Sequence, residues 1–135
     1  MYLIDTNIFL EILLEQEKSE VCEQLLLKIK KSNELFYISS FTLHSIEVIL
    51  IRENKENLLI EFLKYVLTSR IRLITTNIEE ELNIINLAKE FNLDFDDAFQ
   101  FYLCRKNNLK IISYDAHFDP IPITKVDPAE ILDII

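Results

Sequence analysis

The apolar residues of this chain fall into two patterns: short uninterrupted runs, and longer stretches in which they recur at helical spacing. Most of the short runs are rich in Ile and Leu. Such runs are typical of strands that are buried on both faces of a parallel sheet. They predict five strands, over residues 2–4, 35–38, 71–74, 110–113 and 124–126.

The stretches with helical spacing separate these strands and predict seven helices. In each stretch the apolar residues return every three or four positions, which places them on one face of a helix. Thr76 followed by Glu79 predicts a capping box at the start of the fifth helix. We expect Asp94 to cap the sixth helix, and either Thr6 or Asn7 to cap the first.

Strands that alternate with helices form βαβ units, in which the strands are parallel and the helices cover the sheet. The pattern therefore predicts an α/β fold, a three-layer α/β/α sandwich around a central parallel sheet. The sequence of 135 residues shows no internal repeat, low-complexity tract or linker. We expect residues 1–135 to form one domain, since a chain of this length can bury a self-sufficient core.

The composition is acidic and lacks glycine. The formal net charge is −9 and the isoelectric point is about 4.7. A chain with this charge repels a phosphate backbone unless cations intervene or basic residues gather on one face. Without glycine, turns that need positive φ must use Asn or Asp, and asparagine is frequent in this chain.

The two cysteines, Cys22 and Cys104, lie far apart inside helical patterns and have no zinc-finger spacing. We expect them to be buried free thiols in a reducing cytosol rather than a disulfide. No apolar run approaches the roughly 20 residues that span a bilayer. No basic segment precedes an apolar run at the amino terminus, so we expect no signal peptide and a cytoplasmic location.

Four carboxylates from separate segments should meet at one edge of the predicted sheet. Asp5 and Asp115 each follow a strand directly, and the carboxyl ends of parallel strands share an edge. Asp97 lies in the first turn of the sixth helix, and the amino ends of helices lie at that same edge in βαβ units. Glu47 lies one to two turns into the third helix, within a side chain's reach of the edge.

Four bare carboxylates at one place would repel one another, so their convergence predicts a bound cation. Mg²⁺ and Mn²⁺ prefer oxygen ligands and suit such a set. Two such ions about 4 Å apart stabilise the attacking and leaving oxygens of a phosphodiester, and one of them activates water. The predicted chemistry is phosphodiester hydrolysis in which metal ions, rather than a basic surface, hold the phosphate.

Each acid also has a purely structural explanation. Asp97 favours the amino end of a helix through the helix dipole, as does the neighbouring Asp94. Asp115 fits a turn, and Asp5 fits the N-cap of the first helix. Glu47 is the hardest to explain in this way, because an acid on a helix that is apolar nearly all round needs a partner. One metal site accounts for all four acids with a single cause.

Four motifs, in order along essentially the whole chain, resemble the PIN domain family, which includes the VapC-like toxin ribonucleases. They are Asp5-Thr6-Asn7 after the first strand, Glu47 in mid-chain, Asp97-Ala98 at a helix start, and Ser113-Tyr114-Asp115-Ala116-His117-Phe118 after a late strand. The resemblance implies a Rossmann-like α/β/α sandwich with a parallel sheet. It also implies a Mg²⁺- or Mn²⁺-dependent endoribonuclease.

The resemblance further implies roles for individual residues and partners. It assigns catalysis and metal binding to Asp5, Glu47, Asp97 and Asp115. It assigns supporting roles to Thr6, Asn7 and Ser113. A toxin of this family would cleave RNA, be blocked by a small antitoxin protein and form a homodimer. The abundance of Ile, Leu and Phe predicts either a large but ordinary core or an exposed apolar patch among the second to fourth helices, for a dimer or a partner peptide.

Several neighbouring residues leave the assignment open. Asp96 is the alternative to Asp97 as the third acid. Asp119 is either an auxiliary acid or a turn residue. His44 shares a helix face with the predicted glutamate and His117 lies just after a predicted aspartate, but packing and surface-loop roles are the preferred interpretations.

Two other functions compete with the ribonuclease. A PIN-like module that binds RNA or protein without cleaving it would keep the fold and lack the metal site. A receiver domain of a signalling pathway also gathers acids around Mg²⁺ on a doubly wound sheet. A receiver needs a phosphoacceptor aspartate on a central strand and a lysine after a late strand, whereas Glu47 and Asp97 lie on predicted helices here. The receiver domain therefore ranks last.

Overall fold

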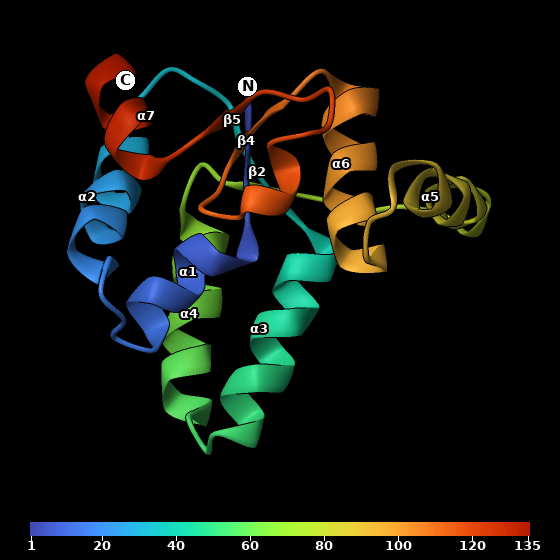
Figure 1. The fold of residues 1–135 in the computed structure, drawn as a ribbon. Helices are drawn as coiled ribbons and strands as arrows, with labels where there is room; N and C mark the ends of the chain where they lie inside the picture. Colours follow the sequence, from blue (N-terminus) through green and yellow to red (C-terminus); the bar gives the residue numbers. More distant parts are fainter.

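Five short parallel strands form one sheet, in the spatial order β3-β2-β1-β4-β5. The sheet lies at the centre of the molecule (Figure 1). The computed structural model describes residues 1–135. The strands are Tyr2–Ile4 (β1), Phe36–Ser39 (β2), Arg72–Ile74 (β3), Lys110–Ile112 (β4) and Lys125–Val126 (β5). In the central strand β1, Leu3 pairs with Tyr37 of β2 and with Ile111 of β4. The predicted parallel sheet is confirmed.

Seven α-helices and one short 3₁₀ helix surround the sheet (Figure 1). The α-helices are Thr6–Leu13 (α1), Ser19–Ile29 (α2), Ser40–Arg52 (α3), Glu56–Thr68 (α4), Ile78–Phe91 (α5), Phe95–Asn107 (α6) and Pro128–Ile134 (α7). The 3₁₀ helix is Ala116–Phe118 (η1), just after β4. Each predicted helix is present within a few residues of its expected position.

The alternation of side chains along β1 defines two apolar cores, one on each face of the sheet. Tyr2 and Ile4 belong to one core, together with apolar side chains of α1, α2, α3, α4 and α7. Leu3 belongs to the other core, together with side chains of α5, α6 and η1. Leu3 and Ile4 are fully buried, and burying one such side chain is worth about 1.5–3 kcal/mol. The fold is therefore the predicted three-layer α/β/α sandwich.

Polar residues at the strand ends begin the next helices. Asp5, rather than the predicted Thr6 or Asn7, is the N-cap of α1, because its extended backbone lets its carboxylate accept a hydrogen bond from the Thr6 amide. Ser39 caps α3 by accepting a hydrogen bond from the Thr42 amide. Both caps place a polar side chain at the carboxyl edge of the sheet, where ligands bind in this class of fold.

Two other predicted caps differ in detail. The capping box of α5 is formed by Asn77 and Glu80, one residue later than the predicted Thr76 and Glu79. The extended conformation lies at Asn77, so the predicted pair is wrong. Asp94 is the N-cap of α6, as predicted, but its side chain makes no capping hydrogen bond.

Asparagine provides most of the turns with positive φ, as the absence of glycine predicts. Asn54, Asn92 and Asn108 have φ values of 57°, 52° and 55°. Asn92 and Asn108 are the left-handed C-caps of α5 and α6. The short polar side chain of asparagine makes this conformation less costly than it is for most residues. Glu15, just after α1, is the exception, with a φ of 51°.

Cys22 and Cys104 are buried free thiols, as predicted. None of the helices combines the length and the apolar character that crossing a bilayer requires.

Replacing Glu15 with glycine should stabilise the protein, because glycine adopts positive φ without the steric cost of a β-carbon. We expect the free energy of unfolding, measured by urea denaturation, to rise by up to about 1 kcal/mol. Glu17→Gly is the matched control, since it removes the same charge at a position without positive φ and should lower stability. A Glu15→Gly protein that is as destabilised as the control would contradict this explanation.

Candidate active site

A cleft of about 290 Å³ opens at the edge of the sheet where β1 and β4 end. Its walls carry Asp5 from the end of β1, Asp96 and Asp97 from the first turn of α6, and Asp115 from the segment after β4. No Lys or Arg lines this acidic cleft. Low-dielectric walls with charge of one sign focus the field, so the acidic cleft attracts cations.

Asp5 is buried in the acidic cleft, and its carboxylate accepts four hydrogen bonds. Oδ1 accepts bonds from the Thr6 amide (2.9 Å) and from Gln100 Nε2 (3.0 Å). Oδ2 accepts bonds from Ser113 Oγ (2.7 Å) and from Asn7 Nδ2 (3.2 Å). These donors come from three segments of the chain and hold the carboxylate in one orientation.

Gln100 is a buried polar residue that links Asp5 to the junction of β2 and α3. Its Oε1 accepts a hydrogen bond from Ser39 Oγ (2.7 Å), and its Nε2 also donates to Thr42 Oγ1 (3.0 Å). Thr42 Oγ1 lies 2.8 Å from Thr6 Oγ1, which closes the network. No buried side-chain nitrogen or oxygen is left without a partner. The network therefore fixes Asp5 without an unpaired polar group, which would be costly.

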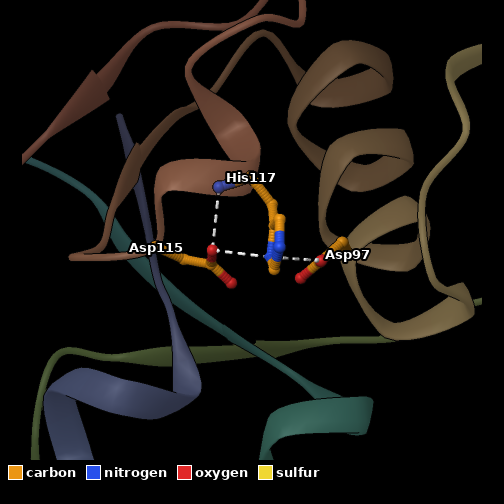
Figure 2. A group of neighbouring side chains, drawn as sticks. All are labelled: Asp97, Asp115 and His117. Carbon is orange, nitrogen blue, oxygen red and sulfur yellow. Dashed lines mark hydrogen bonds and ion pairs between the residues drawn. The ribbon is translucent and has the colours of Figure 1, made fainter.

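A cluster of three side chains lies at the amino end of α6 and consists of Asp97, Asp115 and His117 (Figure 2). His117 Nδ1 lies 2.9 Å from Asp115 Oδ1 and 3.4 Å from Asp97 Oδ2, so the imidazole stands between the two carboxylates. Asp115 also caps η1 by accepting a bond from the His117 amide at 2.8 Å. The short 3₁₀ helix therefore brings the histidine back over the aspartate that starts it.

Burial and like charge shift the proton affinity of these acids. Burial raises the pKa of Asp97 to about 6, and the charges of Asp115 and Asp96 add to the rise while His117 opposes it. Burial also raises the pKa of Asp5, with a smaller rise from Asp115, while the hydrogen bonds that Asp5 accepts lower it. Burial and mutual repulsion therefore both disfavour the charged forms of Asp5 and Asp97, and a divalent cation would offset both effects.

The structure brings three of the four predicted ligands, Asp5, Asp97 and Asp115, to the acidic cleft. The predicted supporting residues lie beside them, namely Thr6, Asn7 and Ser113. Asp96, the alternative to Asp97, also lines the acidic cleft. The topology alone explains this result, because all these residues follow a strand or begin a helix at one edge of the sheet.

Glu47 is the predicted ligand that the structure does not bring there. Its carboxylate lies 2.9 Å from His44 Nδ1, and it does not line the acidic cleft. Thr42, Ser45 and Ile49 follow the helical repeat and form the face of α3 that points toward Asp5 and its network. Glu47 lies two residues after Ser45, about half a turn round the helix, and so presents its side chain elsewhere.

Asp119 also lies outside the acidic cleft. It is exposed and pairs with Lys125 Nζ at 2.7 Å. This position favours the turn alternative that the sequence left open, since the carboxylate is neutralised by a lysine of β5 rather than grouped with the other acids.

Three residues of the site were missed or undervalued by sequence reasoning. Gln100 and Thr42 form the buried network around Asp5, and His117 joins two of the acids. Gln100 has a signal, because it lies three residues after Asp97 on the same helix face and stands between two phenylalanines. Thr42 lies three residues after the capping Ser39. The sequence positions of Thr42 and Ser39 do not show that both bond to Gln100, because that contact depends on the fold.

The donor set fits a hard divalent cation. Asp97, Asp115 and His117 can each present one ligand atom, all within 4.8 Å of one another. Asp94, Asp96 and Asp97 form a second group that meets the same limit. Carboxylate oxygens suit Mg²⁺ and Mn²⁺, and the absence of thiolates from both groups argues against a soft-metal site.

Comparison with known proteins agrees with this geometry. A model of the PIN domain family matches residues 2–123. No curated protein matches the sequence.

Similar solved structures include the VapC20 protein of Mycobacterium tuberculosis, described as a sarcin-ricin loop cleaving toxin. It has a TM-score of 0.79 and 15% identity, over 95% of this chain and 100% of that chain. VapBC2 of Rickettsia felis, bound to a promoter DNA fragment, has a TM-score of 0.75 and 17% identity, over 93% and 97%. A toxin–antitoxin complex from Klebsiella pneumoniae has a TM-score of 0.70 and 20% identity, over 95% and 98%. At these identities the likeness shows the fold.

Replacing Asp97 with asparagine should stabilise the metal-free protein at neutral pH, because it removes a charge that is buried and is also repelled by Asp115 and Asp96. The pKa of about 6 in the folded protein exceeds the ordinary value of 3.8, so the folded state binds this proton more tightly than the unfolded state. The stability that the proton provides is complete below about pH 4 and is lost as the pH rises to about 6.

Thermal unfolding of both proteins in EDTA, from pH 4 to pH 8, tests whether Asp97→Asn raises or lowers stability. Wild type should lose stability relative to Asp97→Asn between about pH 4 and pH 6, and the gap should then stay constant, on the order of 1 kcal/mol after screening. Parallel pH curves for the two proteins would show that the pKa of Asp97 is not raised in the folded protein.

Proposed function

The chain belongs to the PIN domain family, and from this premise we propose that it is a divalent-metal-dependent endoribonuclease that hydrolyses RNA phosphodiester bonds. The observation that carries the proposal is the convergence of Asp5, Asp97 and Asp115 in one cleft that contains no Lys or Arg. Three carboxylates that have no Lys or Arg beside them, and only His117 between two of them, suit a metal centre better than a structural ion-pair network.

The proposed ligands of Mg²⁺ or Mn²⁺ are Asp5, Asp97 and Asp115, with Asp96 beside them. When bound, such an ion supplies an activated water and stabilises the charge on the phosphate. The protein contributes orientation, since the four hydrogen bonds to Asp5 preorganise its carboxylate. His117 holds Asp115 through its 2.9 Å contact and reduces the repulsion between Asp115 and Asp97.

The acidic charge of the whole chain supports the need for a cation. With a net charge of −9 and no basic residue in the acidic cleft, the protein cannot hold an RNA phosphate there by its own charge. The same fact disfavours a receiver domain, which needs a lysine near its acids. An inert PIN-like binding module keeps the fold but should bind no metal through these carboxylates, and the cleavage assay below separates it from the nuclease.

We further propose that the protein is the toxin of a type II toxin–antitoxin pair, blocked by a small antitoxin protein. The support is the likeness to VapC20 and to two toxin–antitoxin complexes, in which such partners are present. A nuclease of this kind would act on RNA in the cytoplasm, where Cys22 and Cys104 stay reduced. Residues 1–135 would form its single nuclease domain.

We also propose a homodimer that uses the outer face of α5. Ile78, Leu82 and Ile85 follow one another at helical spacing and are 82%, 62% and 44% exposed. Exposure of such an apolar stripe to water is unfavourable, and a stripe of this kind is typical of an interface. Exposed apolar residues also occur on α2, α3 and α4, where the sequence led us to expect the patch, for example Leu67 of α4.

Cleavage of a mixed-sequence single-stranded RNA tests the nuclease. Wild type should be active with Mg²⁺ or Mn²⁺ and inactive in EDTA, and Asp5→Asn should lose activity by about 100-fold or more, because the buried carboxylate is replaced by a neutral amide. Glu47→Gln removes the same charge outside the acidic cleft and should keep most of the activity.

Metal-independent cleavage that is equal in wild type and Asp5→Asn would remove the proposal. Loss of activity in Glu47→Gln to the level of Asp5→Asn would instead restore Glu47 as a ligand, which would require α3 to rotate. Wild-type protein that binds RNA without cleaving it in either metal would support the inert module.

Leu82→Glu should convert the proposed dimer to a monomer, because it places a charge in the middle of the apolar stripe of α5. Sedimentation velocity at micromolar concentration measures the change. Leu67→Glu, at an 84% exposed position of α4, is the matched control and should leave the dimer intact. A dimer that survives Leu82→Glu and dissociates in Leu67→Glu would move the interface to the patch that the sequence predicted.

A further inference from the structure

A second cavity, of about 580 Å³, lies directly beside the acidic cleft. The two share Phe41, Ser45 and Ile49 of α3 as a common wall. We call the second cavity the α3–α6 groove, since α3 and the start of α6 form its main sides. A ligand whose reacting group sits in the acidic cleft therefore has room to extend into the α3–α6 groove without leaving the protein surface.

Aromatic rings form one side of the α3–α6 groove. Phe99 packs between Phe41 and Phe95, with ring centroids 5.8 Å and 6.2 Å away. Phe95 is 40% exposed although it is a large apolar residue at the start of a helix. A partly exposed phenylalanine on a fixed aromatic support is a stacking platform for a planar ring.

The polar groups of the α3–α6 groove select against a phosphate. No Lys or Arg lines it, and its one histidine, His44, pairs with Glu47 through Nδ1 at 2.9 Å. The partly buried Glu81 also lines it. Glu81 forms no ion pair, so its carboxylate is available as a hydrogen-bond acceptor. Thr75 and Thr76 add hydroxyl groups on the same side. A neutral, planar ligand with N–H donors on its edge matches these walls better than any anion.

We propose that the α3–α6 groove is a nucleobase subsite, which stacks one unpaired base of the RNA against Phe95 while a neighbouring phosphate lies in the acidic cleft. The proposal rests on the ribonuclease function above. Guanine is the base that fits best, because its N1–H and N2–H₂ donors lie side by side and can both bond to the Glu81 carboxylate. Uracil fits worst, since its single N–H donor stands between two carbonyl oxygens that the carboxylate repels.

The chain contains no tryptophan, so Phe95→Trp introduces a single tryptophan into the α3–α6 groove, which can be excited at wavelengths where the five tyrosines do not absorb. A base that stacks on the indole should quench its fluorescence. The probes are 5′-GMP, 5′-UMP and ribose 5-phosphate in Mg²⁺, because none of them contains a phosphodiester that the protein could cleave. Saturable quenching by GMP is expected at concentrations about tenfold below those for UMP, with none from ribose 5-phosphate. Leu67→Trp, on α4 and outside the α3–α6 groove, is the control and should show no saturable quenching.

Two further variants assign the contacts. In the Phe95→Trp background, Glu81→Gln should remove the preference for GMP over UMP, because an amide both donates and accepts. In the otherwise unchanged protein, Phe95→Ala should raise KM for single-stranded RNA on the order of tenfold, the usual loss for one stacked base, with a smaller effect on kcat.

The outcomes separate this inference from the proposed function. RNA cleavage without saturable quenching by any nucleotide would overturn the subsite and leave the ribonuclease standing. Saturable, base-dependent quenching without RNA cleavage would support the subsite and overturn the ribonuclease. Equal quenching by ribose 5-phosphate would show a sugar-phosphate site and overturn the inference. So would a change from dimer to monomer in Phe95→Ala, because the α3–α6 groove would then be an interface between copies of the chain.

Discussion

The buried carboxylate of Asp5 and its four hydrogen bonds are the interaction on which the rest of the site depends. Taking a carboxylate out of water is costly unless donors replace the lost hydration. Here the donors come from the start of α1, from α6 and from the residue after β4. They meet only because β1 lies beside β4 and α6 packs across the sheet. The same order of strands therefore builds both the core and the site.

The architecture was predictable from the sequence because its signals are local and repeated. Short apolar runs between helical stretches indicate a parallel sheet covered on both faces, and the absence of glycine correctly predicted asparagine at positive φ. The predicted N-caps of two helices were displaced by one or two residues. Thr76 and Asn77 are both good capping residues, and only the extended backbone at Asn77 decides between them. The capping preferences of Thr and Asn cannot decide between the two positions, because the backbone conformation there depends on the path of the chain after β3.

The site was predictable to the extent that topology alone places its residues. Asp5, Asp97 and Asp115 each lie at the end of a strand or the start of a helix, so a parallel sheet brings them to one edge whatever their side chains contact. Glu47 lies inside α3, where the direction of a side chain depends on the rotation of the helix about its axis. Packing of Ile46 and Leu50 into the core sets that rotation and turns Ser45 toward the acidic cleft. No rule of sequence spacing fixes this angle.

The distribution of charge also bears on how the proposed RNA substrate would be recognised. Most proteins that bind nucleic acid gain affinity, without regard to sequence, from lysines and arginines on the phosphate backbone. This chain has a net charge of −9, and neither the acidic cleft nor the α3–α6 groove is lined by a Lys or Arg. Under the proposed function, the phosphate at the reacting position contacts a cation held by three carboxylates, and the proposed base subsite adds uncharged contacts. If both proposals hold, such a nuclease should bind random RNA weakly, because few cations face the phosphate backbone near the cleft. Its choice of substrate should then depend on the α3–α6 groove beside the proposed metal ligands rather than on the electrostatic field around the molecule.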